Sequence, residues 1–409
     1  MRLPGRHVVL GVSGGIAAYK SCSLVRRLRE AGAMVEVVLS RAAARFVGPV
    51  TFEALSGRPV ATSLWSPGAA LSHIRLAKEA DLVVIAPATA NLIARAALGI
   101  SDDLLTAILR ARTGPVLVAP AMNDAMFADP ATQRNLAVLA ARGWAMVGPE
   151  VGPLAEGESD APGRMSEPEV ILAHAGRCLL RSPPFVGLRV LVTAGPTREA
   201  LDPVRVLTNR SSGKMGYRIA EAAWRRGAEV TLVSGPSSEP DPPDLPVVRV
   251  ESTADMSREV AARLPSSEVL VMAAAPADFQ PVETSTTKRA KQGQDPTLAL
   301  RPTEDILSST RALRRADAVI VGFALETGDA VEKARRKLDA KAMDLVVVND
   351  ALEVGAGFEV DTNRVAILHR TGESTMVPLR SKTDIAEAIL DEVEVVLGRR
   401  ASAVLEAAD

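Results

Sequence analysis

The chain has 409 residues, of which 47% are apolar and 24% are charged, and its formal net charge is -1. Because this length exceeds what one hydrophobic core serves, we expect two domains of about 200 residues each. The balanced charge argues against binding to nucleic acid or to an anionic membrane, and no stretch has the ~20 unbroken apolar residues of a membrane span.

The number of cysteines indicates in which cellular compartment the protein is expected. Cys22 and Cys178 are the two cysteines of the chain, too few for a disulfide scaffold and consistent with a reducing cytosol. Arg2 and Arg6 precede an apolar run in the manner of a signal peptide, but a Ser-Gly-Gly turn breaks the run and no cleavage site follows. We therefore expect a cytoplasmic protein.

The first forty residues predict a βαβ unit. Residues 7–12 form an apolar strand, the turn Ser13-Gly14-Gly15 leads into a helix up to about residue 31, and a second strand over 35–39 ends on Ser40. The turn lacks the third glycine of the dinucleotide fingerprint, and no acidic residue ends the second strand. These two departures favour a mononucleotide over a nicotinamide cofactor.

Two more buried strands lead into polar loops. Residues 81–91 form a strand with the loop Ala88-Thr89-Ala90-Asn91, and the strand over 115–119 runs into the segment that contains Asn123. Since ligands lie beyond the carboxyl ends of parallel strands, both loops are candidate site elements. Between them, residues 99–106 predict a helix start capped by Ser101 or Asp102.

Two features of the first half, His73 and the stretch 148–168, have two interpretations each. His73 precedes the helix before residue 81, and a lone histidine becomes a candidate only beside other functional groups. The irregular stretch 148–168 is either a linker or a flap over a site. A helix over 168–180 closes the first domain, and the double-proline segment 181–187 is the better linker candidate.

The second half repeats the alternation of strand and helix, which predicts a second doubly wound domain over 188–409. The expected fold is therefore α/β, with two Rossmann-like three-layer domains, the first of them flavodoxin-like. Strands are predicted at 189–193, 229–233, 247–250, 269–272, 319–324 and 345–350, a hairpin over 365–369 and 375–379, and helices at 216–226, 254–264 and 382–397.

The turn over 209–216 is a candidate phosphate site. Its serines and glycines can present backbone N–H groups at a helix N-terminus, although such a turn alone is usually an ordinary strand-to-helix connection. Asn209 and Lys214 bracket it with an amide and a cation. The spacing is not that of a P-loop.

Two groups of cations follow in the second half. A triphosphate needs such charges, although a solvated charge run is the simpler interpretation. The groups are Lys288, Arg289 and Lys291 in the polar loop 283–296, and Lys333, Lys337 and Lys341 at four-residue spacing.

Together these motifs resemble one family over essentially the whole chain: the bifunctional phosphopantothenoylcysteine decarboxylase/phosphopantothenate–cysteine ligase of coenzyme A biosynthesis. Each motif alone is weak, but this many in one order is specific. The first half carries GVSGGIAAYK, the histidine motif at 71–76, APATAN and PAMNDAMF. The second half carries TAGPTRE, DPVR, TNRSSGKMG, AAAPADF, VGFALET and VVVND.

For the second half, the resemblance implies that cysteine is ligated to 4′-phosphopantothenate with CTP, through an acyl-cytidylate and with Mg²⁺ or Mn²⁺. Asn209 would steady the acyl-cytidylate carbonyl, Lys288 would neutralise the triphosphate, and Asp278 would lie near the nucleotide or its metal. The implied nucleotide-binding residues also include Ala273, Ala274, Ala275, Thr303, Glu304, Asp305, Ile306, Phe323, Lys337 and Lys341.

For residues 1–180, the resemblance implies FMN-dependent decarboxylation of 4′-phosphopantothenoylcysteine to 4′-phosphopantetheine. His73 would be the base and Asn123 the contact to the substrate carboxylate. Relatives of this domain assemble as trimers and those of the second as dimers, which implies a homo-oligomer, a dodecamer if both hold. FMN would be held by Ser13, Gly14, Ser40, Ala88, Thr89, Ala90, Asn91 and Ser101.

The chain departs from the family in its flap. The family has a cysteine there that donates a proton in the final reduction, whereas residues 154–158 have none and Glu156 stands at the apparent position. A carboxyl group screened by a closed flap can keep a proton to donate, so we expect acid substitution. The basic cluster departs as well, because Arg289-Ala290 interrupts a lysine-rich motif.

Two other hypotheses stay open at this point. One keeps the ligase and makes the flavin domain non-productive, because the proton-donor cysteine is missing. The other is a nicotinamide-dependent dehydrogenase built on two doubly wound domains. Bound flavin, which absorbs near ~450 nm, would separate the dehydrogenase from the flavoproteins.

Overall fold

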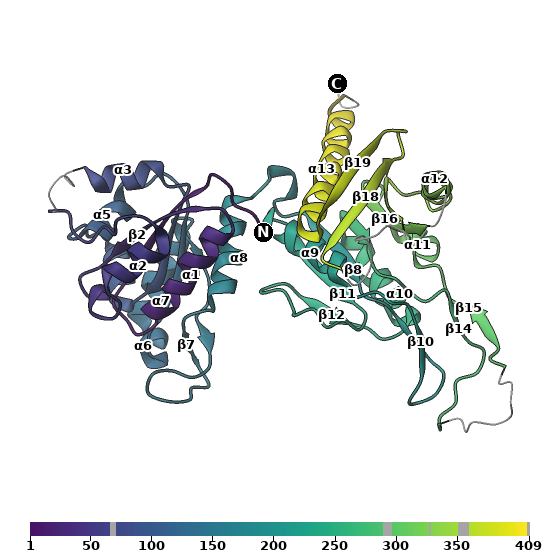
Figure 1. Ribbon diagram of the computed structural model, residues 1–409, viewed down its shortest axis with the longest axis horizontal. Helices are drawn as coiled ribbons and strands as arrows, with labels where there is room; N and C mark the ends of the chain where they lie inside the picture. The colour runs from purple at the N-terminus through teal and green to yellow at the C-terminus, as the bar shows by residue number, and fades with distance from the viewer. Residues whose placement is uncertain (66–70, 289–296, 327–328, 351–359, 407–409) are drawn as a thin grey trace. The chain divides into compact units, whose positions relative to one another are not determined.

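The computed structural model describes residues 1–65, 71–288, 297–326, 329–350 and 360–406 (Figure 1). The predicted basic residues Arg289 and Lys291 lie outside these ranges. The chain divides into two compact units, Met1–Leu180 and Arg181–Asp409, and each contains its own large sheet.

The first unit is built on a five-stranded parallel sheet with the order β2-β1-β3-β4-β5. Every residue of β1 and β3 is buried, because helices cover both faces, and apart from His7 at the start of β1 both strands are apolar. The order reverses between β1 and β3, the switch point of a flavodoxin-like sheet. The strands are β1 (His7–Val12), β2 (Met34–Leu39), β3 (Leu82–Ala88), β4 (Val116–Pro120) and β5 (Ala145–Met146).

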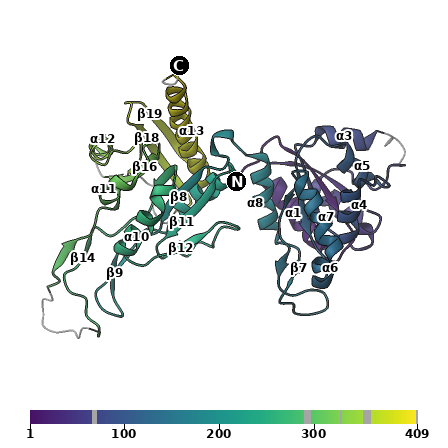
Figure 2. The same cartoon turned by 180° about the vertical axis from the view of Figure 1, so that it is seen from behind.

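Two hydrophobic clusters lie on the two faces of this sheet, so the predicted three-layer architecture is confirmed (Figures 1 and 2). One cluster is formed with α1 (Ala18–Glu30), α2 (Pro49–Ser56) and α8 (Pro168–Leu179). The other is formed with α3 (Ser72–Glu79), α4 (Ala90–Leu98), α5 (Leu104–Ala111) and α7 (Pro130–Ala141). The remaining elements are η1 (Ala43–Arg45), α6 (Asp124–Ala128), β6 (Glu150–Val151) and β7 (Pro162–Arg164).

The cap of α5 differs from the sequence prediction. Asp103 caps the helix, because it accepts a hydrogen bond from the backbone N–H of Thr106 at 2.8 Å, and its own N–H donates to the Thr106 hydroxyl at 3.2 Å. The predicted caps, Ser101 and Asp102, were wrong. Asp103 stands at the spacing from Thr106 that a capping box requires, and Asp102 pairs with Arg95 instead.

The second unit contains an eight-stranded sheet with the order β12-β11-β8-β13-β16-β17-β18-β19. Six strands are parallel and follow the Rossmann order, whose switch point lies between β8 and β13, and an antiparallel hairpin extends one edge. The strands are β8 (Arg189–Ala194), β11 (Glu229–Ser234), β12 (Val247–Arg249), β13 (Val269–Met272), β16 (Val319–Glu326), β17 (Leu345–Asp350), β18 (Thr362–His369) and β19 (Ser374–Ser381).

Helices cover both faces of this sheet too. On one face, α9 (Lys214–Arg225) packs beside α13 (Lys382–Glu406), and Arg226 forms ion pairs with acidic side chains of α13. The other face carries α10 (Thr253–Arg263), α11 (Ile306–Ser309) and α12 (Ala330–Ala340). The short elements are β9 (Arg198–Ala200), β10 (Val206–Thr208), β14 (Phe279–Pro281), β15 (Leu300–Pro302), η2 (Pro183–Phe185), η3 (Leu264–Ser266) and η4 (Arg311–Leu313).

The segment 181–187, predicted as a linker, packs against the second unit. Phe185 is fully buried, and the guanidinium of Arg226 lies 5.5 Å from the centroid of its ring. The hydroxyl of Ser182 donates a hydrogen bond of 2.7 Å to Glu394 of α13. These residues therefore contribute to the packing of the second unit before β8 begins.

Candidate functional sites

Two predicted flavin-binding loops are joined at the switch point of the first sheet. The hydroxyl of Ser13 donates to the carbonyl of Pro87 at 2.7 Å and accepts from the N–H of Thr89 at 3.0 Å, which fixes the loop after β1 to the loop after β3. A Cβ on Gly14 would lie 2.3 Å from that of Ala42. Only glycine therefore allows the loop after β2 to come this close.

Two helices begin at this edge. The first turn of α1 has neither a side-chain cap nor an acidic residue, whereas Thr89 caps α4. Ser40 lies at the same edge, where its hydroxyl accepts from the N–H of Ala43 at 3.1 Å. Uncapped N–H groups at the positive end of a helix suit a phosphate, so these loops fit the single phosphate of FMN. Ser101 is exposed between α4 and α5.

A pocket of about 370 Å³ opens beside the start of α1. It is lined by residues 15–17, 19 and 20 of that segment, by Asn123 from the loop after β4, and by Glu156 and Arg164 from the irregular stretch. The stretch 148–168 is therefore a flap over a pocket of the first unit.

Asn123 and Glu156, two predicted catalytic residues, contact each other in this pocket. The side-chain amide of Asn123 donates a hydrogen bond to a carboxylate oxygen of Glu156. The amide oxygen of Asn123 caps α6 by accepting from the N–H of Ala125 at 2.8 Å. Because the cap uses the oxygen, the NH₂ group is the part of Asn123 available to Glu156 and to a ligand. Glu156 itself is exposed.

Two further contacts fasten the flap to the same loop. The N–H of Met122 donates to the carbonyl of Gly163 at 3.0 Å. The hydroxyl of Ser159 donates to the carboxylate of Asp124, and this hydrogen bond lowers the pKa of Asp124. Both contacts lie on the C-terminal side of Glu156 and hold that part of the flap against the loop after β4.

His73 is not among the residues that line this pocket. It lies in the first turn of α3, on the face of the sheet opposite to α1. Its Nδ1 atom is buried and has no hydrogen-bond partner in the described part of the chain. The described residues of one chain therefore do not bring the predicted base together with Asn123 and Glu156.

In the second unit, backbone contacts join the loops at the switch point between β8 and β13. The N–H of Ala275 donates to the carbonyl of Gly195 at 2.9 Å, and the N–H of Ala274 donates to the hydroxyl of Thr193 at 3.2 Å. A Cβ on Gly216 would lie 2.8 Å from the carbonyl oxygen of Thr193, so α9 starts directly against β8. Its N-terminus has no side-chain cap.

A pocket of about 490 Å³ lies at this switch point. The turn 209–215 forms one wall, and the structure brings it together with some of the nucleotide-site residues predicted from the sequence. The predicted residues that line the pocket are Asn209, Ala273, Ala274, Ala275, Asp278 and Phe323.

The side chain of Asn209 holds one wall of this pocket in place. Its NH₂ group donates to the carbonyl of Pro276 at 2.9 Å and to that of Ala275 at 3.3 Å. The carboxylate of Asp278, two residues further on, is exposed at the pocket. An exposed carboxylate there is a suitable ligand for Mg²⁺, which takes oxygen donors and substrate phosphates.

The other predicted nucleotide residues do not line the pocket. Thr303 contacts a residue that does line it, because the N–H of Thr303 donates to the carbonyl of Asp278 at 3.0 Å. Asp305 pairs with Lys341 at 2.6 Å; burial raises the pKa of Asp305, but the hydrogen bonds from Lys341 and Ser308 outweigh it and leave the pKa lowered. Ile306 is buried in the core, and Glu304, Lys337 and Lys288 are exposed.

Three polar residues of this pocket were missed by the sequence analysis. Asn349 of β17, Asn363 of β18 and Lys382 of α13 also line it. Asn363 is 1% exposed and Lys382 is 5% exposed. One signal was available for Lys382, because a lysine at the first position of a predicted helix opposes the helix dipole.

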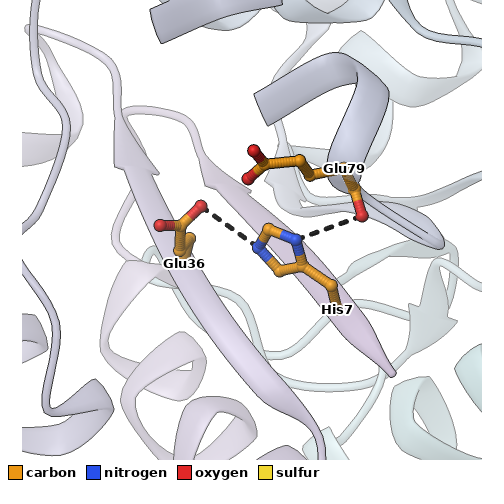
Figure 3. A group of neighbouring side chains, drawn as sticks. All are labelled: His7, Glu36 and Glu79. Atoms are coloured by element: carbon orange, nitrogen blue, oxygen red, sulfur yellow. Dashed lines mark hydrogen bonds and ion pairs between the residues drawn. The ribbon is translucent and has the colours of Figure 1, made fainter. Parts of the chain in front are cut away.

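A third cluster, of His7, Glu36 and Glu79, lies at the amino-terminal end of β1, and none of the three lines the pocket of the first unit (Figure 3). The ring nitrogens of His7 face the carbonyl of Glu79 and the carboxylate of Glu36, each at 3.1 Å. Arg75 also contacts both oxygens of Glu36 at 3.3 Å. A metal ion would have to compete with the guanidinium of Arg75 for Glu36, so we interpret the cluster as a polar network that joins β1, β2 and α3.

Glu36→Gln is expected to lower the free energy of unfolding by about 1–2 kcal/mol near neutral pH. The hydrogen bond from His7 is the largest cause of the lowered pKa of Glu36, and the value in the absence of interactions is 4.5. The stabilisation is therefore complete above that pH and is lost as the pH falls through the lower, folded-state pKa. Chemical denaturation of both proteins between pH 7 and pH 3 measures the difference.

Glu79→Gln is the matched control, because Glu79 contacts His7 through its backbone carbonyl, which this change preserves. Its effect should be the smaller of the two. A difference between wild type and Glu36→Gln that stays constant down to pH 3 would contradict the network.

Comparison with known proteins covers both units. Residues 1–177 match the family model of the flavoprotein domain, and residues 185–396 match that of the DNA/pantothenate metabolism flavoprotein C-terminal domain. Over 400 residues the chain is 43% identical to the coenzyme A biosynthesis bifunctional protein CoaBC of Vibrio vulnificus (strain YJ016), covering 97% of this chain and 99% of the relative. The chain belongs to the CoaBC family.

Other CoaBC proteins match equally well. The protein of Bacillus subtilis (strain 168) is 45% identical over 396 residues, covering 96% of this chain and 97% of its own length. The chain is thus a bifunctional enzyme of coenzyme A biosynthesis, with a flavoprotein decarboxylase domain followed by a ligase domain. The resemblance found in the motifs is confirmed, and the dehydrogenase hypothesis finds no support.

Solved structures related to the CoaBC family match each half separately. The C-terminal domain of a CoaBC protein is 37% identical and covers 53% of this chain and 100% of its own, with a TM-score of 0.46. A mutant PPC decarboxylase complexed with pantothenoylaminoethenethiol is 34% identical and covers 42% of this chain and 96% of its own, with a TM-score of 0.38. In the described residues, no helix is both long and apolar enough to cross a membrane.

Proposed function

We propose that this chain performs two consecutive steps, each in one of the two switch-point sites. The ligase step joins 4′-phosphopantothenate to L-cysteine at the expense of CTP, and the decarboxylase step converts the product to 4′-phosphopantetheine with FMN. The observation that carries the proposal is the pocket of about 490 Å³, which gathers Asn209, residues 273–275 and Asp278 at the edge where a Rossmann sheet binds nucleotides.

In the ligase step, the carboxylate of 4′-phosphopantothenate attacks the α-phosphate of CTP and pyrophosphate leaves. The amine of cysteine then attacks the acyl carbon, and CMP leaves as the amide forms. Asn209 orients the loop at residues 275–276 and stabilises the acyl-cytidylate carbonyl. Asp278 holds Mg²⁺, which offsets charge on the triphosphate, and the exposed Lys288 adds a positive charge.

The nucleotide is proposed to extend from the pocket toward Thr303, which is bonded to the Asp278 loop. Residues 304–306 then contact the nucleotide mainly through backbone groups, because the side chain of Ile306 is buried in the core. Lys341 acts here through its ion pair with Asp305, and Lys337 lies one turn earlier on α12.

In the decarboxylase step, the loops at Ser13–Gly14, Ser40 and 88–91 hold FMN, with its phosphate near the uncapped start of α1. Bound FMN supplies the two-electron oxidation of the cysteine moiety and its later reversal. The NH₂ group of Asn123 binds the substrate carboxylate, which leaves as CO₂. Glu156 then donates the proton that accompanies the final reduction, screened from water by the bound substrate.

We propose that the active form is a homo-oligomer, with trimeric first units and dimeric second units. His73 lies on the face of its sheet opposite to α1, so it would serve as the base of a site on another copy. Ile16 and Tyr19, which line the first pocket, are 61% and 60% exposed, and a neighbouring copy or the flavin would cover them.

The assay that tests the proposal supplies 4′-phosphopantothenate, cysteine, CTP and Mg²⁺ to the purified chain. We expect CMP, pyrophosphate, CO₂ and 4′-phosphopantetheine in equal amounts, no CMP when Mg²⁺ is chelated, and a yellow protein. Accumulation of 4′-phosphopantothenoylcysteine would favour the hypothesis of a non-productive flavin domain. Absence of CMP would refute the ligase assignment.

A further inference from the structure

The nucleotide pocket of the second unit lies where two helices begin with a lysine each. Lys214 is the first residue of α9 and Lys382 is the first residue of α13, and both line the pocket. The two helices pack beside each other on one face of the sheet (Figure 1). A lysine at a helix N-terminus adds its charge to the positive end of the helix dipole, which is locally unfavourable. Two such helix starts bring two ammonium groups to this one pocket.

The two lysines differ in their surroundings. Lys214 forms an ion pair of 2.7 Å with Asp361, whose side chain is 87% exposed. Lys382 is only 5% exposed, and its backbone N–H donates to the carbonyl of the same Asp361 at 2.9 Å. A buried ammonium group is costly unless something in its site compensates the charge.

The surroundings of Lys382 lower the pKa of its ammonium group. Burial is the largest cause of its shifted pKa, followed by repulsion from Lys214, and together they lower the pKa from 10.5 to about 8. Asp361 and Glu239 act in the opposite direction, and Arg218 adds to the repulsion. The protonated form of Lys382 is therefore marginal near pH 8.

We propose that Lys382 binds the phosphate chain of the nucleotide together with Lys214 and takes up a proton when the nucleotide binds. This inference rests on the proposed ligase function. A polyphosphate between the two ammonium groups replaces their repulsion by attraction and complements both helix N-termini. Lys382 is in this sense a positioning residue for the triphosphate.

Titration calorimetry tests the inference. It measures the binding of CTP with Mg²⁺ to the full chain at pH 8, in buffers that differ in their enthalpy of ionisation. We expect wild type to take up a fraction of a proton per CTP, because burial and Lys214 lower the pKa of Lys382 to about 8 while the phosphates are already ionised. Lys382→Met should weaken CTP binding by about 10- to 100-fold, the effect of losing a charged hydrogen bond, and should abolish the uptake.

Two further variants separate charge from structure. Lys382→Arg keeps a permanent charge, so it should keep most of the affinity but show no proton uptake. Arg380→Met removes a positive charge two residues earlier at an exposed position and should change the affinity by no more than about twofold. Should Lys382→Met fail to fold, the arginine variant alone decides the question.

The outcomes distinguish this inference from the function beneath it. If wild type does not bind CTP, the proposed ligase site fails and the role of Lys382 fails with it. If wild type binds CTP but Lys382→Met binds equally well, or if the arginine variant still takes up a proton, the role of Lys382 is wrong while the ligase site stands.

Discussion

Asn209→Asp is expected to reduce CTP-dependent ligation by at least about 100-fold, the effect of removing a donor to a developing oxyanion. The change also replaces an NH₂ group by a carboxylate opposite two carbonyl oxygens, those of Ala275 and Pro276, at 3.3 and 2.9 Å. Two hydrogen bonds become two repulsions, and the loop that carries Asp278 should move. Steady-state release of CMP or pyrophosphate measures the loss.

The decarboxylation reaction of the first unit is the control for this prediction. Decarboxylation of supplied 4′-phosphopantothenoylcysteine should be unchanged, because the two units have separate sheets and separate pockets. Asn209→Ala removes the donor without adding charge and should be less impaired than the aspartate variant. Equal rates for both variants would show that the loop contact does not matter, and ligation within a few fold of wild type would exclude Asn209 from the site.

The fold of both units followed from the sequence because each element carries its own local signal. Buried parallel strands such as 82–88 are unbroken apolar runs, and the glycine turns after β1 and β8 stand where a helix must approach a strand closely. The hairpin β14–β15 and the short strands of the flap were not predicted. They have few residues and no apolar alternation, so only contacts distant in sequence stabilise them.

The site was less predictable, for a different physical reason. Motifs such as the turn 209–216 concentrate chemistry in neighbouring residues, and these positions line the pocket. Asn349, Asn363 and Lys382 come from three elements far along the chain, and only the strand order places them beside that turn. Lys337 and Glu304 were predicted from the resemblance to the family, but they lie at exposed positions and do not line the pocket.

Glu156→Gln is expected to reduce formation of 4′-phosphopantetheine by about 100-fold or more, since general acid catalysis contributes at least about that factor. Glutamine keeps the size of the side chain and can still accept from the NH₂ group of Asn123, but it cannot release a proton as a carboxylic acid does. The substrate should still be oxidised and decarboxylated, so an oxidised thiol product with two hydrogens fewer should accumulate. Mass spectrometry of the quenched reaction distinguishes this product from 4′-phosphopantetheine.

Two variants make the assignment specific to position 156. Glu156→Cys should restore the complete reaction, because a thiol at the tip of the flap is also an acid that can donate a proton. Glu158→Gln removes an exposed carboxylate two residues away on the same flap and should leave the rate unchanged, which excludes a general effect of flap charge. If Glu156→Gln forms 4′-phosphopantetheine at the rate of wild type, the proton comes from another group and Glu156 only fastens the flap to Asn123.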